Sequence, residues 1–322
     1  MHTFEALRSR LVAKIDQEVS PWSAELAAHL REMAKPCLAL VPTDGPWAAR
    51  FGGSTLLPEG VPWPKNARGQ HLDYLGLVDL TALANAGSGA LEPSWPNAGV
   101  LPIFVEHLGS AAEPVVLRCV HAAVGVETVV ERLPPEASAV IGHESLVDLQ
   151  AVNVAAVPSV SIPTTSRRVK RLVRAADEPD AAVILDELLW GIAPENAIGQ
   201  VGGWANSHQD DLYRQTALRA LGRGELVYAD YWESLDEYEA SIIRHPGAAR
   251  MYRGKRKSVL WLLEHAQEVS AEAERWSLVL RLRSNREMGL LINDSDPLFV
   301  FIPKDDLSAA RFDRVTGCVL QG

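Results

Sequence analysis

Apolar residues recur at spacings of three and four along the first part of the chain, the period of an amphipathic helix. On the first predicted helix they are Phe4, Leu7, Leu11, Ile15 and Val19. We expect a second helix to begin after the N-cap residue Ser23 and to end before Pro36, because proline cannot continue a helix. Residues 1–35 are therefore predicted to form an N-terminal helical pair.

Short apolar runs bounded by glycine and proline predict β-strands. The predicted strands span residues 37–41, 75–80, 100–105, 115–121, 124–131, 278–283 and 297–302. Residues 42–72 are rich in glycine and proline, and three prolines between 58 and 64 exclude a helix or a central strand there. Because this segment also carries apolar residues, we expect a loop that packs onto the body of the protein.

Helical patterns return at about 181–190 and dominate 208–268. Ser234 followed by Glu237 has the spacing of a capping box, which predicts that a helix begins there. A further apolar stripe predicts a helix on Val259, Leu262, Leu263, Ala266 and Val269.

One pattern occurs twice in the chain: a Gly-Gly turn, a half-buried strand and a short apolar strand with an aromatic residue. The first copy occupies 50–53, 75–80 and 99–105, and the second occupies 200–203, 278–283 and 297–302. This repetition predicts an α+β fold that arose by internal duplication, with two related, mostly antiparallel sheet modules and flanking helices. The predicted modules are 36–150 and 151–322, packed as one compact two-lobed unit.

The second copy contains an insertion. Gly53 and Leu75 are 22 positions apart, whereas Gly203 and Leu278 are 75 apart, so the second copy is longer by 53 residues. We expect this insert, at about 205–275, to be helical.

Both copies contain specific motifs. The first half carries Gly52-Gly53, Leu57-Pro58, Gly60 and Trp63-Pro64, followed by Leu75-Gly-Leu-Val-Asp-Leu80. The second half carries Gly202-Gly203, His208-Gln209-Asp210, Trp276–Leu280, Leu298–Ile302, Asp306-Leu307 and Phe312-Asp313. Over about residues 50 to 315, these motifs resemble the YwqG-like family of bacterial proteins, a domain of unknown function. The resemblance implies an α+β fold built by duplication and implies no established reaction.

Composition narrows the class of protein. A hydrophobic content of 47% with 22% charged residues is typical of a globular chain. The net charge of −10 disfavours binding to nucleic acid or anionic membranes and favours a basic partner. Three distant cysteines, no secretory pattern at the N-terminus and no long apolar window predict a cytoplasmic protein.

The common catalytic signatures are absent from the sequence, so we assign no catalytic residue, metal ligand or cofactor. Two pairs of residues could still serve a hydrolase or a transferase. His71 and Asp73 could form a catalytic pair or an ordinary solvent-facing edge pair. Asp294 and Asp296 could bind a divalent cation or belong to a hairpin turn.

The turns of the two copies are candidates for a small-ligand site between the halves, because Trp47, Trp63, Trp95 and Trp204 lie in or near them. Packing of the rings in the core is the alternative. The helix start near 208–211 could hold an anion or be capped by Asp210 and Asp211 themselves. The candidate ligand or family-motif residues are Gly52, Gly53, Pro58, Trp63, Pro64, Gly202, Gly203, Trp204, Gln209 and Asp210.

The predicted insert is acidic between Arg223 and Arg244, which suggests either a docking face for a basic protein or the wet face of surface helices. The candidate partner-binding residues are Glu225, Asp230, Glu233, Asp236, Glu237 and Glu239. Two basic clusters, at 167–174 and 253–257, could bind phosphate, pair with this acidic stretch or be solvated surface. Three functions follow as hypotheses: a non-catalytic interaction protein of the immunity or regulatory type, a small-ligand binding module, and an unrecognised hydrolase or transferase.

Overall fold

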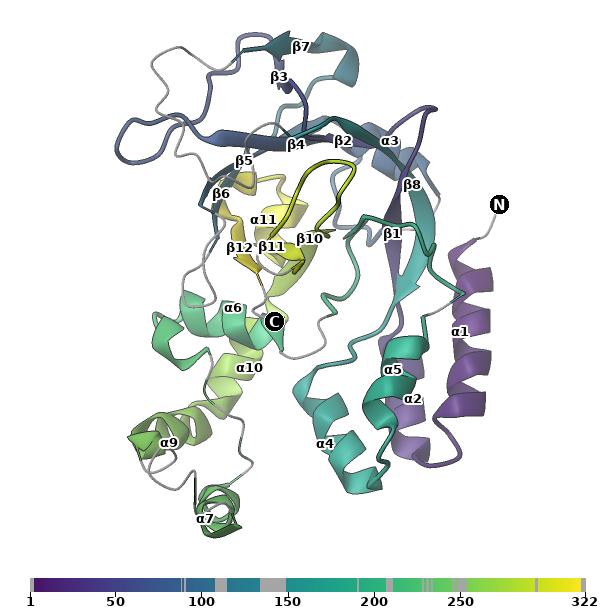
Figure 1. Cartoon of the computed structure of the whole chain (residues 1–322), viewed down its shortest axis with the longest axis vertical. Helices are drawn as coiled ribbons and strands as arrows, with labels where there is room; N and C mark the ends of the chain where they lie inside the picture. Colours follow the sequence, from purple (N-terminus) through teal and green to yellow (C-terminus); the bar gives the residue numbers. More distant parts are fainter. Residues whose placement is uncertain are drawn as a thin grey trace. The chain divides into compact units, whose positions relative to one another are not determined.

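The computed structural model describes all residues except 1–2, 88, 90, 108–114, 134–148, 190, 207–210, 228, 230–231, 233, 245–246, 248–253, 293–294 and 320–322. The chain forms two compact units (Figure 1). The sheet unit comprises residues 1–210 and 277–322, and the helical unit comprises residues 211–276.

Within the described residues, the sheet unit contains a ten-stranded sheet in the order β12-β11-β10-β9-β1-β8-β2-β4-β5-β6. The strands are β1 (Lys35–Pro42), β2 (Ala49–Phe51), β4 (Asp73–Asp79), β5 (Val100–His107), β6 (Val116–Cys119), β8 (Val152–Ser161), β9 (Gly199–Val201), β10 (Trp276–Leu282), β11 (Leu298–Pro303) and β12 (Thr316–Val319). Wherever their register is defined, neighbours run antiparallel. The two edges meet where Val115 N donates to Gly317 O over 3.2 Å, so the sheet closes nearly into a barrel.

Alternation along the strands separates an inner from an outer face, since successive side chains of a strand point to opposite sides. Leu38 and Leu40 of β1, Val201 of β9 and Leu280 and Leu282 of β10 belong to the core inside the near-barrel. The residues between them, including Ala39 and Arg281, therefore face outward.

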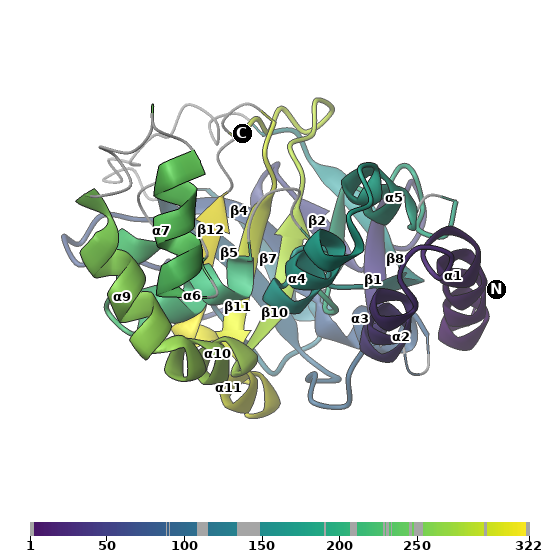
Figure 2. The same ribbon diagram turned by 90° about the horizontal axis from the view of Figure 1, so that it is seen from below.

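Four helices cover part of the outer face: α1 (Phe4–Glu18), α2 (Ala24–Met33), α4 (Arg167–Ala176) and α5 (Ala181–Glu187). They lie beside β1 and β8 in both ribbon views (Figures 1 and 2). Thr3 and Ser23 cap α1 and α2 by accepting hydrogen bonds from Ala6 N and Leu26 N. The apolar stripe of α1 is buried. All four helices contribute residues to a second hydrophobic core, which also contains Val160 at the end of β8 and Ile162 directly after it.

The glycine- and proline-rich segment is more ordered than the sequence predicts, because it contains β2 and β3 (Thr55–Pro58). β3 pairs with β7 (Val129–Arg132) in a two-stranded sheet outside the main one, where Pro58 at the end of β3 is tolerated. The strand predicted over 124–131 is wrong in its first part, since 126–128 forms the 3-10 helix η1 (Val126–Thr128). The remaining short helices of this unit are α3 (Leu80–Asn85), α11 (Lys304–Ser308) and η4 (Phe312–Arg314).

The mixed helical and antiparallel architecture confirms the α+β class. The strands of the two predicted modules join in one sheet, and its central pair includes a strand that the sequence patterns did not predict. This strand, β8, pairs with β1 over eight residues, from Lys35 opposite Ser161 to Pro42 opposite Val154.

The helical unit contains α6 (Leu212–Ala220), η2 (Gly224–Leu226), α7 (Leu235–Arg244), α9 (Arg256–Glu264) and α10 (Ala266–Glu274). Its core is built from Ala217, Leu218, Leu226, Val227 and Val269. The continuous stripe predicted over 259–269 is divided between α9 and α10, because the chain turns at His265.

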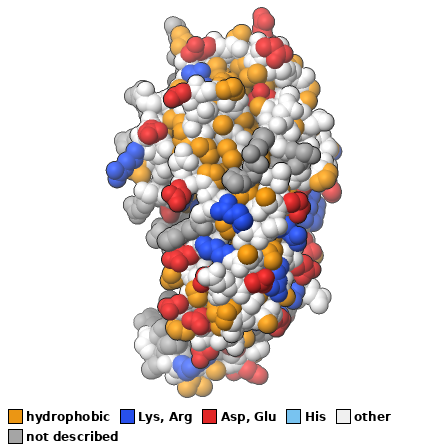
Figure 3. Space-filling model, turned by 90° about the vertical axis from the view of Figure 1, so that its right-hand side faces the viewer, with side chains coloured by type: hydrophobic (Ala, Val, Ile, Leu, Met, Phe, Trp, Pro, Cys, Tyr) orange, Lys and Arg blue, Asp and Glu red, His pale blue; other side chains and the backbone are white. Residues whose placement is uncertain are grey.

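None of the described helices is long and apolar enough to cross a membrane. On the face shown in Figure 3, Lys and Arg side chains are interspersed with Asp and Glu rather than separated into areas of one sign. The net charge of the chain is therefore not gathered on this face.

Candidate functional site: the arginine cavity

A cavity of about 460 Å³ lies on the outer face of the sheet, within the sheet unit. We call it the arginine cavity. Its floor comes from β8, β1, β9 and β10, and its wall comes from α5 and the chain that follows it. It is lined by Ala39, Ser159, Val160, Thr164, Leu185, Asp186, Leu189, Ala193, Pro194, Glu195, Ala197, Gly199, Gln200, Asn206, Arg281 and Arg283. This volume is in the range of small-molecule sites.

The strand register brings the floor residues together. Gln200 of β9 lies opposite Ala39 of β1 on one side and Arg281 of β10 on the other. Directly opposed residues project on the same face of a sheet. Arg283 lies two positions beyond Arg281 and therefore shares its face, and its backbone N–H still pairs with Ile198 O over 2.8 Å. The small side chain of Ala39 leaves room beside the two arginines.

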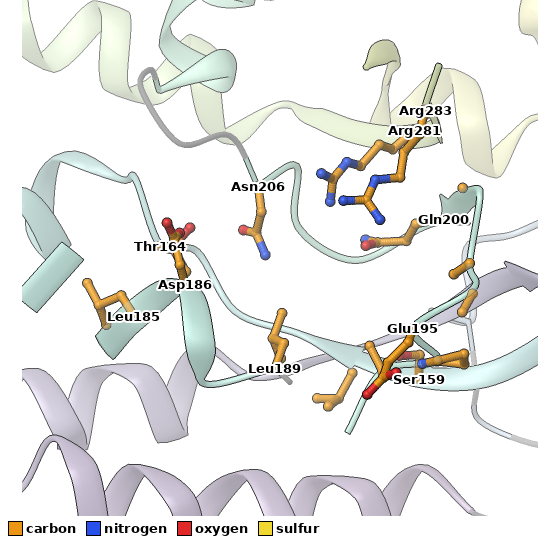
Figure 4. A pocket seen from close by; sticks show the side chains of 16 residues that line it. Ser159, Thr164, Leu185, Asp186, Leu189, Glu195, Gln200, Asn206, Arg281 and Arg283 are labelled. Atoms are coloured by element: carbon orange, nitrogen blue, oxygen red, sulfur yellow. The ribbon is translucent and has the colours of Figure 1, made fainter. Parts of the chain in front are cut away.

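Both guanidinium groups point into the cavity, toward Asn206 and Gln200 (Figure 4). Arg281 is half-buried, and its Nε is fully enclosed without a hydrogen-bond partner. Burial and, secondarily, the charge of Arg283 lower the pKa of Arg281 to about 10. Among the described residues no carboxylate forms an ion pair with Arg281 or Arg283. A charge buried without a counter-charge is costly, so Arg281, with the exposed Arg283 beside it, creates a site that favours an anion.

Two amide side chains complete the polar part of the cavity. Gln200 Nε2 donates to Gly202 O at 2.8 Å and to Trp204 O at 3.1 Å, which leaves Gln200 Oε1 as the acceptor that faces away from the turn. Asn206 Oδ1 is buried without a partner. The site therefore offers acceptor oxygens as well as cationic donors.

The second Gly-Gly turn supports the cavity from outside. A Cβ atom on Gly203 would lie 2.3 Å from Ser161 Oγ and 2.9 Å from Cys37 Cβ, and the backbone φ there is +71°. The close approach allows Trp204 N to donate to Ser161 Oγ at 2.9 Å. Trp204 Nε1 donates to Met33 O, and Lys35 Nζ lies 4.3 Å from the Trp204 ring centroid. The turn of Gly202, Gly203 and Trp204 therefore holds the Gln200 side chain in position, although none of these three residues lines the cavity.

The first Gly-Gly turn lies elsewhere on the sheet. Gly53 has φ of +68°, and a Cβ atom there would lie 2.6 Å from Ala151 Cβ, so this turn also packs closely against the strand segment beside it. Trp63 is 8% exposed, and its Nε1 donates to Leu72 O at 2.9 Å. Pro64 O accepts from Leu72 N. Gly52, Gly53, Pro58, Trp63 and Pro64 form no part of the arginine cavity.

The predicted residues at the start of the helical unit are only partly described. Gln209 and Asp210 lie outside the described residues. Asp211 caps α6, because its side chain accepts from Arg214 N at 3.1 Å. Of the two alternatives predicted for this helix start, capping by its own aspartate is therefore confirmed for Asp211.

Of the acidic partner candidates, Asp230 and Glu233 lie outside the described residues. Glu225 pairs with Arg223 at 2.7 Å, and Glu239 pairs with Arg256 of the second basic cluster at 3.4 Å. Glu237 N donates to Ser234 Oγ, as a capping box requires, and Asp236 is exposed in the first turn of α7. Part of the acidic stretch is thus neutralised within the helical unit.

The candidate catalytic pair is not assembled. Within the described part of the chain, no hydrogen bond or ion pair joins His71 to Asp73; His71 lies edge-on to Trp63 at 6.4 Å between ring centroids. Burial raises the pKa of Asp73 to about 6. Asp294 lies outside the described residues, and no group of three or more potential metal ligands occurs in the described ranges.

Gln200, Asn206, Arg281 and Arg283 were not predicted as site residues. The available signal was the alternation Leu280-Arg281-Leu282-Arg283 in a predicted strand, which places two arginines on one face.

A family model described as Domain of unknown function (DUF1963) matches residues 49–319, which is most of the chain. This match is consistent with the resemblance to the YwqG-like family. A search of the curated proteins finds no match.

Proposed function

We propose that this chain, which belongs to the family described as Domain of unknown function (DUF1963), is a binding protein for a small anionic ligand held in the arginine cavity. The observation that carries this proposal is Arg281, whose enclosed Nε has no partner and whose pKa is lowered by burial and further by the charge of Arg283. An anion would supply the missing acceptors and offset the repulsion between the two guanidinium groups. Hydrogen bonds between arginine and anions are among the strongest in proteins.

Titration calorimetry with inorganic phosphate, at an ionic strength matched with sodium chloride, tests the proposal. We expect saturable binding by the wild-type protein and at least tenfold weaker binding by Arg281→Met. The matched control is Arg286→Met, because Arg286 is exposed and lies outside the cavity lining. Equal affinities of all three proteins, or no binding by the wild type, would contradict the proposal.

A second candidate function is docking of a basic protein on α7. Ile243 of this helix is 80% exposed and lies one turn from Glu239, so an apolar and an acidic side chain share one surface. If this surface binds a partner, the wild type captures a protein that the double variant Asp236→Lys with Ile243→Asp does not capture. Equal capture by both would contradict this role.

We also propose that the sheet arose by duplication. The strand order supports this, because β9, β10, β11 and β12 follow outward from β1 as β2, β4, β5 and β6 follow outward from β8. Superposition of residues 49–119 on residues 199–319 should overlay these strands in order, and failure to do so would refute the duplication.

A further inference from the structure

The two arginines at one end of the arginine cavity indicate how much charge that end of the ligand carries; the lining also contains the carboxylates of Asp186 and Glu195. Arg281 and Arg283 bring two positive charges to one end, where no described carboxylate is paired with them. A single carboxylate would neutralise one of these charges. A phosphate monoester carries nearly two negative charges at neutral pH, because its second pKa is about 6, and its three terminal oxygens can accept from both guanidinium groups.

The remaining polar groups indicate what the rest of the ligand offers. Asn206 Oδ1 is buried without a partner, and within the described part of the chain no hydrogen bond reaches Gln200 Oε1; both residues lie beside the arginines (Figure 4). A ligand must therefore bring N–H or O–H groups close to its own anionic group. Hydroxyl groups satisfy neutral amide oxygens without adding positive charge next to two arginines, whereas an ammonium group would be repelled there. Asp186 and Glu195, at the exposed margin, can accept further hydroxyl groups.

The apolar wall indicates what the ligand lacks. The apolar side chains of the lining are aliphatic, among them Val160 of the floor and Leu185 and Leu189 of the wall. None of the described lining residues is aromatic, so the wall provides no ring on which a nucleobase could stack.

We infer that the ligand of the arginine cavity is a phosphate monoester that carries several hydroxyl groups and no base, which is the chemistry of a sugar phosphate. This inference rests on the proposed anion site. Arg281 and Arg283 bind the phosphate, and Asn206 and Gln200 accept hydrogen bonds from the hydroxyl groups.

The experiment compares probes by titration calorimetry: inorganic phosphate, glycerol 1-phosphate, ribose 5-phosphate, glucose 6-phosphate and adenosine monophosphate. We expect at least one of the three hydroxylated phosphates to bind ten times more tightly than inorganic phosphate and more tightly than the nucleotide. Asn206→Leu should remove this gain and leave the affinity for inorganic phosphate unchanged, while Arg281→Met should weaken every probe. Thermal unfolding of each variant without ligand shows that it is folded.

The possible failures are distinguishable. If inorganic phosphate binds through Arg281 but the hydroxylated phosphates gain nothing, the proposed anion site stands and the sugar-phosphate inference is overturned. The same holds if the nucleotide binds most tightly, or if Asn206→Leu weakens inorganic phosphate as much as the hydroxylated probes. Absence of binding by every probe overturns both.

Discussion

Replacing Arg281 by methionine should make the ligand-free protein more stable. Burial is the main reason that the pKa of Arg281 falls from its ordinary value to about 10. At 1.36 kcal/mol for each pKa unit, the charged guanidinium costs the folded state roughly 3 kcal/mol. Methionine keeps most of the aliphatic length of the side chain and removes the charge.

Part of this gain is offset. The Arg281 guanidinium carbon lies 5.7 Å from the Phe299 ring centroid, and a contact of this kind contributes about 0.5 to 1 kcal/mol. We therefore expect Arg281→Met to raise the free energy of unfolding by about 2 to 2.5 kcal/mol. The enclosed Nε has no hydrogen bond to lose.

The dependence on pH has a definite sign. Because the pKa of this base is lower in the folded state, the cost of its charge is fully present below pH 10 and is relieved only as the pH rises from about 10 toward the ordinary pKa of arginine. The gain in stability should therefore be the same at pH 6 and at pH 9.

Urea denaturation of the wild type, Arg281→Met and Arg286→Met provides the measurement. The control should change by less than about 0.5 kcal/mol, because Arg286 is exposed. At a phosphate concentration of about 100 times its dissociation constant for the wild type, the wild type should gain about 2.7 kcal/mol, and a variant that binds ten times more weakly should gain only about 1.4 kcal/mol, so the stability difference between them becomes smaller. A variant that is less stable than the ligand-free wild type by 1 kcal/mol or more would refute the reasoning, because Arg281 would then have a partner in the folded protein.

Three further predictions concern the support of the fold. Gly203→Ala should lower the unfolding free energy by about 2 to 4 kcal/mol, because the new Cβ meets Ser161 Oγ at 2.3 Å. The control Gly222→Ala has a φ of +70° and open space around it, so it should lower the unfolding free energy by only about 1 kcal/mol. Equal losses would show that backbone strain alone decides. Asp306→Ala should cost about 2 to 4 kcal/mol in urea denaturation, because this carboxylate is 1% exposed and accepts from Arg311 Nε at 2.9 Å; a loss below 0.5 kcal/mol would contradict a stabilising pair. Asp73→Asn should stabilise the protein by about 1 to 2 kcal/mol at pH 7.5 and progressively less toward pH 4. The reason is that a carboxyl whose pKa is raised to about 6 in the folded protein reduces stability above that pH and not below its ordinary pKa of 3.8. A gain in stability that is constant over this pH range would refute the assignment.

Local patterns predicted the elements that depend on neighbouring residues. The buried stripe Leu7, Leu11 and Ile15 and the caps Thr3 and Ser23 specify α1 and α2 with little help from the rest of the chain. The pairing partners of β1 could not be predicted in this way. β8 contains two adjacent alanines and Pro158, which weaken the strand pattern, and it forms because β1 and β2 pair with it on either side.

The arginine cavity shows the same division. Its two arginines alternate with leucines, so their common face follows from the period of two in a strand. Gln200, Asn206 and Ala39 join them only through the register of three strands and through the turn at Gly202 and Gly203. These contacts connect residues that are far apart in the chain, and no short window of sequence contains that information.

By itself, the amino-acid sequence determined the α+β class, the N-terminal helical pair and the two Gly-Gly turns, since each depends on side chains within a few positions of one another. The tertiary structure alone decided that the strands form one nearly closed sheet and that the half-buried Arg281 lies beside the exposed Arg283 without an ion-pair partner among the described residues. The physical reason is that the strength of a charge–charge interaction depends on burial and on distance in space, and both are set by strand pairing across the whole chain.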